Sequence, residues 1–331
     1  MKTPAYFWKK WHPVALLLSP LSLLMWVVVA IRRLLYDLRI FRVHRCSVPV
    51  IVVGNLTVGG TGKTPLVIWI CNHLKKLGYN PGVVLRGYGG TAASWPQQVR
   101  RDSDPHVVGD EAVVIAAETG CPVCAGPDRV DAAKALVQHA RCDVILSDDG
   151  LQHYALGRDI EIVVIDGERR FGNGLLLPAG PLREGVGRLR RADFIIINGN
   201  CSDNEHCMQQ MPGEVINLET GETMALEEWS GRMVHLVSGI GNPARFIDMV
   251  RGAGIETDQR LFPDHHDYGP GDLEFNDDLP VLMTAKDAVK VRPFADNRFW
   301  YLKLRVDPSA TFVHQVVTAL IMKRDHGQKT A

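Results

Sequence analysis

A glycine-rich segment, Gly54–Pro65, constrains the fold of this chain more than any other feature. It reads Gly-Asn-Leu-Thr-Val-Gly-Gly-Thr-Gly-Lys-Thr-Pro, follows the apolar run Val48–Val53 and precedes apolar residues at helical spacing over Leu66–Leu77. Strand, glycine-rich loop and helix in this order predict a phosphate-binding loop (P-loop), because backbone N–H groups and the positive end of a helix dipole then face one anion. The residues expected to contact the nucleotide are Thr57, Gly59, Gly60, Thr61, Gly62, Lys63 and Thr64.

Two residues of this loop have specific expected roles. Lys63 is predicted to reach the terminal phosphates, and the Thr64 hydroxyl to hold Mg²⁺. The strict G-x-x-x-x-G-K-[ST] pattern fails at its first position, which is Thr57. What remains resembles the Gly-Gly-x-Gly-Lys-Thr loops of the deviant Walker class, although Val58 replaces the additional lysine common there. A chance glycine-rich turn is the alternative, and the flanking strand and helix disfavour it.

An uncharged apolar segment, Val14–Ile31, lies near the N-terminus. As a helix it extends about 27 Å, close to the roughly 30 Å of a bilayer core, and Pro20 is expected to kink it. A cleaved signal peptide is disfavoured because arginines rather than a small-residue cleavage site follow, and a buried core helix is the other alternative. We interpret residues 1–45 as a membrane anchor that spans the bilayer or lies in one leaflet.

Charge is distributed unevenly along a chain whose net charge is zero. Residues 1–45 contain one acid, Asp37, and eight basic residues: Lys2, Lys9, Lys10, Arg32, Arg33, Arg39, Arg42 and Arg45. The remaining chain therefore holds 29 basic and 36 acidic residues, a net charge of −7. A basic N-terminal segment attached to an acidic remainder of the chain is expected to bind an anionic membrane surface. We expect no nucleic-acid partner. The positive cluster follows the apolar segment, which predicts a cytoplasmic body.

Apolar runs alternate with helical patterns through the first two hundred residues. With 331 residues, 46% of them hydrophobic, the chain is long enough for one large or two medium domains. Continuous apolar strands alternating with helices predict an α/β fold, a P-loop NTPase-like parallel sheet with helices on both faces. We expect this P-loop nucleotide-binding domain over residues 46–205 and a smaller α/β domain over 206–331, joined near the polar stretch Asn198–Gln210.

The seven cysteines are typical of a reducing compartment. Cys121 and Cys124 have the spacing of metal ligands, but no second pair accompanies them and both lie in an apolar run. We therefore expect buried core thiols rather than a zinc site.

Two adjacent acids, Asp148 and Asp149, end the apolar run that begins at Val144. A carboxylate at a strand end orders Mg²⁺ in P-loop sites. Neighbouring side chains on a strand point to opposite faces, so we assign the metal role to Asp148. Asp149 is a second candidate catalytic residue, and Gly150 permits a turn that brings both acids into the site.

Several other polar motifs have ordinary structural explanations as well as functional ones. Asp110 and Glu111 fit the start of a predicted helix. The segment Asp264–Asp267, Asp-His-His-Asp, suits a metal cluster, part of a catalytic dyad or a polar loop. Candidate substrate-binding residues, mostly in loops, are Arg86, Tyr88, Glu111, Arg129, Gln152, His153, Arg183 and Glu184.

Together these motifs resemble one family, the tetraacyldisaccharide 4′-kinases of lipid A biosynthesis. The matching segments, in family order, are the apolar N-terminal helix with its basic flanks, Gly54–Pro65, Arg86–Tyr88, Gly109–Glu111, Asp148–His153, Gly180–Glu184 and Phe262–His266. They cover nearly the whole chain. One departure is Ala285, where the family usually has glutamate.

The resemblance implies that the γ-phosphate of ATP, with Mg²⁺, is transferred to the 4′-hydroxyl of tetraacyldisaccharide 1-phosphate. The product is lipid IVA, formed at the cytoplasmic face of the bacterial inner membrane. The resemblance further implies that Asp110, assisted by a histidine, activates this hydroxyl, and we choose His265 over His266.

Two rival functions share parts of this pattern. A membrane-associated ATPase or GTPase switch of the deviant Walker class shares the loop and the strand-end acids, but Val58 and the additional site residues disfavour it. A soluble P-loop kinase or ligase for a small metabolite leaves residues 1–45 without a purpose.

Overall fold

The computed structural model describes residues 6–9 and 12–328, with side chains as far as Lys323, so Lys2 and Lys10 of the basic N-terminal set lie outside it. Its helices are α1 (Pro13–Asp37), α2 (Lys63–Lys76), α3 (Pro105–Val108), α4 (Asp110–Thr119), α5 (Arg129–Ala140), α6 (Ala244–Gly252), α7 (Ala285–Val291) and α8 (Ala310–Gln328). Its strands are β1 (Val50–Gly54), β2 (Pro81–Leu85), β3 (Gln97–Val99), β4 (Val123–Ala125), β5 (Val144–Asp148), β6 (Ile160–Asp166), β7 (Phe194–Asn198), β8 (His206–Asn217), β9 (Thr223–Ala225), β10 (Met233–Ser238), β11 (Glu256–Leu261), β12 (Val281–Thr284) and β13 (Phe299–Pro308).

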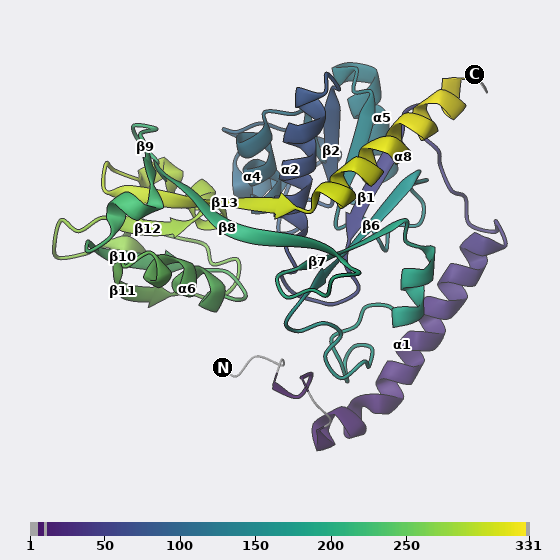
Figure 1. Cartoon of the computed structure of the whole chain (residues 1–331), viewed down its shortest axis with the longest axis horizontal. Coiled ribbons are helices and arrows are strands. Elements are labelled where there is room, and N and C mark those ends of the chain that lie inside the picture. The colour runs from purple at the N-terminus through teal and green to yellow at the C-terminus, as the bar shows by residue number, and fades with distance from the viewer. Residues whose placement is uncertain (1–5, 10–11, 329–331) are drawn as a thin grey trace.

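The first unit is the predicted parallel sheet. Its strands lie in the order β7-β6-β1-β5-β2-β4, all parallel, with β3 added antiparallel at the edge. Buried side chains alternate between two apolar clusters: Ile51 and Val53 face α2, α4 and α8, whereas Val50 and Val52 face α5. Helices thus cover both faces of the sheet (Figure 1). The strands are apolar along their length because both of their faces are buried.

The second unit continues the same sheet rather than starting a separate one. Strands β11, β10, β12 and β13 are parallel, and a long antiparallel pair, β8 with β13, joins them to β7. In Figure 1 this pair extends between the two units. Of the predicted polar connection, only residues 199–205 lie outside strands. Helix α8, expected with the second unit, instead packs Phe312, Val316 and Leu320 into the core of the first.

The cysteines differ partly from expectation. Cys121 and Cys124 are buried in the core, as predicted. Cys201 and Cys207, expected as thiols, form a disulfide across the short connection between β7 and β8. These two cysteines meet because β8 begins at His206 and carries Cys207 back beside the end of β7.

Helix α1 is continuous through Pro20 and lies along one edge of the first unit (Figure 1). Pro20 has no N–H for the Leu16 carbonyl, and the Ser19 hydroxyl donates to that oxygen instead at 2.7 Å. Buried Ser22 anchors the helix, because its hydroxyl donates to the Leu176 carbonyl at 2.7 Å and accepts the Ala179 N–H at 3.0 Å. By length and composition α1 can cross a membrane: its most apolar window has a mean hydropathy of 2.5 and is only 11% buried.

Candidate active site

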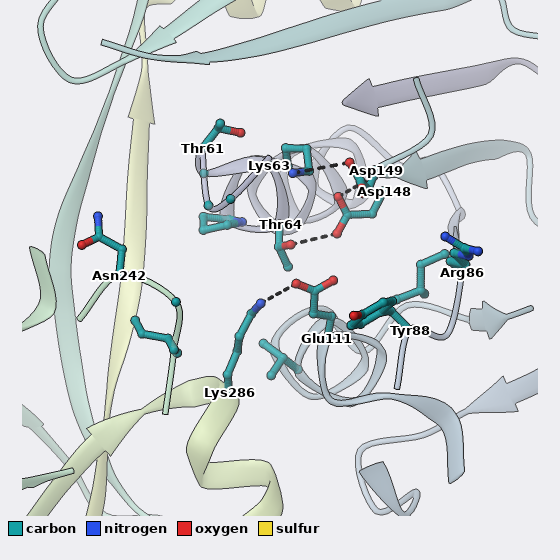
Figure 2. Close-up of a pocket in the computed structure, with 18 of the residues that line it drawn as sticks. Thr61, Lys63, Thr64, Arg86, Tyr88, Glu111, Asp148, Asp149, Asn242 and Lys286 are labelled. Carbon is teal, nitrogen blue, oxygen red and sulfur yellow. Dashed lines mark hydrogen bonds and ion pairs between the residues drawn. The ribbon is translucent and has the colours of Figure 1, made fainter. Parts of the chain in front are cut away.

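One large cleft, about 1090 Å³ in volume, lies where the two units and α1 meet. The P-loop and the carboxyl ends of β2 and β5 form one wall, and residues of α7 and of the loops after β10 and β11 form the other. Met25, Val29 and Arg32 of α1 also line it. Figure 2 shows Lys63, Asp149, Glu111 and Lys286 facing one another across this space. The cleft thus lies at the strand ends, where α/β sheets bind ligands.

The P-loop has the backbone geometry that its glycines predict. Gly62 has φ +92°, and a Cβ built there would lie 2.5 Å from Nδ2 of Asn198, so only glycine fits before α2 begins at Lys63. Residues Gly59 to Thr64 line the cleft. Thr57, expected in the nucleotide site, does not line it and makes an isolated bridge to Leu182, because the chain turns inward only after that point.

Thr64 and Asp148 form the pair predicted for magnesium. The Thr64 hydroxyl donates to Oδ2 of Asp148 at 2.9 Å (Figure 2). Burial is the main cause that raises the pKa of Asp148, to about 6, with Glu111 adding to it and Lys63 opposing it. A buried carboxylate next to a hydroxyl is a suitable site for Mg²⁺. This ion takes few protein ligands and completes its coordination shell with phosphate oxygens and water. Among the described residues, no group of three or more acidic, histidine or cysteine side chains is placed to hold a metal ion.

Asp149 enters the site by a different turn from the one expected. Asp149 itself adopts the left-handed conformation, with φ +48°, whereas Gly150 is required by space, since a Cβ there would lie 2.4 Å from Oγ of Ser147. Asp149 Oδ1 lies 3.4 Å from Lys63 Nζ, and both oxygens accept from Nη1 of Arg183, at 3.0 and 2.9 Å. Burial would raise its pKa, but Lys63 and Arg183 outweigh burial and lower it.

Asp110 and His265 come together across the two units. Nδ1 of His265 donates to Oδ2 of Asp110 at 2.9 Å, since an ionised carboxylate only accepts. Asp110, at the start of α4, is 7% exposed and does not line the cleft, whereas His265 does. Burial opposes ionisation of Asp110, but His265 and Lys286 lower its pKa. In return, the hydrogen bond from Asp110 raises the pKa of His265. The Asp110 carboxylate therefore carries the negative charge of the dyad, and it lies behind the His265 imidazole as seen from the cleft.

The second histidine has a different environment. Nε2 of His266 lies 3.1 Å from Oδ2 of Asp272, and its ring stacks on Phe262 at 4.5 Å. His266 thus packs within its own unit, while His265, with φ +59°, turns toward the first. The Asp264–Asp267 segment is therefore part of a dyad plus a polar loop.

Lys286, which directly follows the family departure at Ala285, is a site residue that the sequence analysis does not predict. Its Nζ forms an ion pair with Oε1 of Glu111 across the cleft (Figure 2). Burial would lower the pKa of Lys286, but Glu111 and Asp110 raise it. Thr284 caps α7 by accepting the N–H of Asp287, which orients this helix and Lys286 with it. A lysine in the first turn of a helix that follows an apolar strand was the available signal.

All the candidate substrate residues line the cleft, but their protein partners differ. The residues are Arg86, Tyr88, Glu111, Arg129, Gln152, His153, Arg183 and Glu184. Arg129 is buried, which lowers its pKa, and its Nε has no hydrogen-bond partner in the described chain. Burial also lowers the pKa of His153, to about 4. Arg183 and Glu184 are instead committed to protein partners, the first to Asp149 and the second to the Tyr154 hydroxyl.

This fold and cleft define a P-loop phosphotransferase with an apolar helix beside its active site. A family model described as tetraacyldisaccharide-1-P 4′-kinase matches residues 14–321. The chain therefore belongs to the tetraacyldisaccharide 4′-kinase family, ATP-dependent kinases of lipid A biosynthesis.

Individual relatives agree with this assignment. The tetraacyldisaccharide 4′-kinase of Nitrosococcus oceani is 49% identical over 95% of this chain and 93% of its own. That of Methylobacillus flagellatus is 46% identical over 92% of each chain. A crystal structure titled as the apo form of LpxK from Aquifex aeolicus in complex with ATP superposes with a TM-score of 0.78, at 26% identity, over 94% of this chain and 99% of that one.

Proposed function

We propose that this protein transfers the γ-phosphate of ATP to the 4′-hydroxyl of a membrane-embedded tetraacyldisaccharide 1-phosphate. One observation carries the proposal: the P-loop, the apolar helix α1 and His265, which is hydrogen-bonded to Asp110, all line the same cleft. A nucleotide switch needs the loop and the strand-end acids but not the dyad, and a kinase for a soluble metabolite does not need α1. The acidic body after residue 45 and the basic residues around α1 support a location on the cytoplasmic face of the bacterial inner membrane.

In this mechanism Lys63 contacts the β- and γ-phosphates. Thr64 and Asp148 would hold Mg²⁺, which supplies neutralisation of phosphate charge when bound. Asp149, with Arg183, orients Lys63 at the loop. These residues lower the barrier mainly by positioning and charge neutralisation, because phosphoryl transfer requires little covalent help from protein.

The acceptor hydroxyl is a weak nucleophile, so proton removal assists it. His265 faces the cleft and Asp110 lies behind it, which supports a route in which the imidazole takes the proton while the carboxylate stabilises the imidazolium. The buried guanidinium of Arg129, with its unpaired Nε, suits an anionic group of the substrate. Met25 and Val29 of α1 suit acyl chains that remain in the bilayer.

The decisive experiment measures phosphate transfer from γ-labelled ATP, with Mg²⁺, to detergent-dispersed tetraacyldisaccharide 1-phosphate. His265→Gln and His266→Gln form a matched pair, since only His265 contacts Asp110. We expect labelled lipid from the wild type and from His266→Gln, and a loss of about 100-fold or more for His265→Gln. A folded, nucleotide-binding wild type that labels no lipid would favour the nucleotide switch instead.

A further inference from the structure

We propose that Arg169 is a further catalytic residue, an arginine supplied by the same chain that contacts the phosphoryl group as it leaves ATP. Arg169 lies in the turn after β6 and lines the cleft beside the P-loop. The inference rests on the proposed placement of ATP in Gly59–Thr64.

The Arg169 side chain is held from behind by Asp166, the last residue of β6. Oδ1 of Asp166 accepts the backbone N–H of Glu168 at 3.2 Å and of Arg169 at 2.9 Å, and Oδ2 accepts from Nη2 of Arg169 at 3.2 Å. Asp166 is only 5% exposed, whereas the Arg169 side chain is 38% exposed. A buried carboxylate thus holds one side of an arginine whose partly exposed side chain lines the cleft.

That guanidinium lies against the two glycines that open the P-loop turn. Its Nη2 donates to the carbonyl oxygen of Gly60, and its Nη1 lies 3.2 Å from where a Cβ on Gly59 would be. Within the described chain, neither Nη1 nor Nε makes a hydrogen bond. Arginine has five N–H donors in a fixed fork that matches phosphate oxygens. Arg169 therefore keeps free donors beside the loop that cradles the phosphates.

The charge balance of the loop gives this arginine a role. Val58 occupies the position of the additional lysine found in loops of this type, so the loop itself contributes only Lys63. Asp149 partly neutralises Lys63 at 3.4 Å, and Arg183 is paired with the same carboxylate. Arg169 is paired with Asp166 on one side only, and its open side faces the cleft. It provides the second cation that the loop sequence lacks.

The reaction step makes clear what this cation does. An oxygen of the acceptor hydroxyl forms a bond to the γ-phosphorus, and the bond from that phosphorus to the β–γ bridging oxygen breaks. The electron pair leaves with ADP, and the hydroxyl proton passes to the Asp110–His265 dyad. Negative charge shifts toward the bridging oxygen and is spread over the transferring group. A guanidinium at this position stabilises that charge, an effect of about 10³-fold or more in kcat where such arginines have been removed.

The test compares Arg169→Ala with Arg170→Ala in the full-length enzyme. Arg170 is in the same turn but forms an ion pair with Glu205 at 2.7 Å and does not line the cleft. We expect Arg169→Ala to lower kcat about 10³-fold, with ADP affinity and Tm close to wild type and partial recovery of kcat on adding guanidinium ion. Arg170→Ala should retain kcat.

Three outcomes separate the possibilities. A kcat for Arg169→Ala within about threefold of wild type would overturn the inference. So would a loss of kcat matched by an equal loss of ADP affinity, since Arg169 would then only support the loop through Gly60. The Lys63→Ala variant tests the placement of ATP separately. If this variant retains ADP affinity and turnover, ATP does not bind at the proposed nucleotide site.

Discussion

Nδ1 of His265 and Oδ2 of Asp110 lie 2.9 Å apart, although 155 positions separate the two residues in the chain. Each belongs to a different unit, so the dyad exists only while the two units keep their present arrangement. The contact between Asp110 and His265 therefore depends on the arrangement of the two units, and the proposed proton transfer depends on this contact.

The dyad predicts a specific pH dependence. Asp110 raises the pKa of His265, and an imidazole that takes a proton must begin neutral. The value of kcat/KM should therefore rise with pH through a pKa above that of an ordinary histidine. In Asp110→Asn the negative charge is lost, so this pKa should fall, the acid limb should move to lower pH, and kcat should drop about 10²- to 10⁴-fold.

Full pH–rate profiles of the wild type and of Asp110→Asn check this expectation. Asp264→Asn is the comparison, because Asp264 raises the pKa of His265 by its charge alone, from 3.9 Å and without a hydrogen bond, so its removal should move the acid limb less. An acid limb that stays in place in Asp110→Asn would mean that another group takes the proton.

The Thr64–Asp148 pair predicts how magnesium dependence responds to mutation. Thr64→Val keeps the shape of the side chain but removes the hydroxyl that donates to Asp148. We expect the Mg²⁺ concentration required for half-maximal turnover to rise at least about 10-fold. Thr64→Ser retains the hydroxyl and should remain close to wild type. A Thr64→Val enzyme with unchanged Mg²⁺ dependence would remove Thr64 from the metal site.

Much of the fold and part of the site could be predicted because they depend on local patterns. The P-loop, the strand that ends at Asp148 and the helix that begins at Asp110 each combine a strong periodicity with a turn signal, and the structure has all three. The family resemblance implies a histidine partner for Asp110, and His265 is chosen because it directly follows Asp264; in the structure His265 is the histidine that contacts Asp110.

Other features depend on contacts that periodicity does not contain. Strand β11, Glu-Thr-Asp-Gln-Arg-Leu, lacks an apolar run because it is the outermost strand of the sheet. Helix α8 packs on the first unit because β13 returns the chain there along β8. The approach of Arg169 to Gly60 joins segments 109 residues apart. None of these three features is indicated by a local pattern in the sequence.

The buried hydroxyl of Ser22 docks α1 on the Leu176–Ala179 segment beside the active-site cleft. In Ser22→Ala the buried N–H of Ala179 loses its partner, which costs about 1–3 kcal/mol. We expect a lower Tm and a higher KM for the lipid substrate, since α1 lines the cleft. Ser19→Ala is the matched control on the same helix, because its hydrogen bond is exposed and its loss should cost less than about 0.5 kcal/mol. Equal effects of the two substitutions would contradict specific docking by Ser22.

The segment that follows α1 predicts electrostatic binding to the membrane. Arg39 and Arg42 are exposed and alternate with the exposed apolar residues Leu38, Ile40 and Phe41. Each arginine near an anionic surface contributes about 1 kcal/mol, so reversing both charges should weaken binding to vesicles containing anionic lipid by about 30-fold or more. The loss should be greatest at low ionic strength, where screening is weakest.

Vesicle co-sedimentation of the Arg39→Glu, Arg42→Glu enzyme measures this effect, and assays on detergent-dispersed substrate should show that its kcat is retained. A matched control reverses Arg100 and Arg101, which are also exposed but lie in the turn after β3. If both double variants bind vesicles as well as the wild type, apolar insertion of α1 alone accounts for attachment. If both lose binding equally, total charge rather than the position of Arg39 and Arg42 determines it.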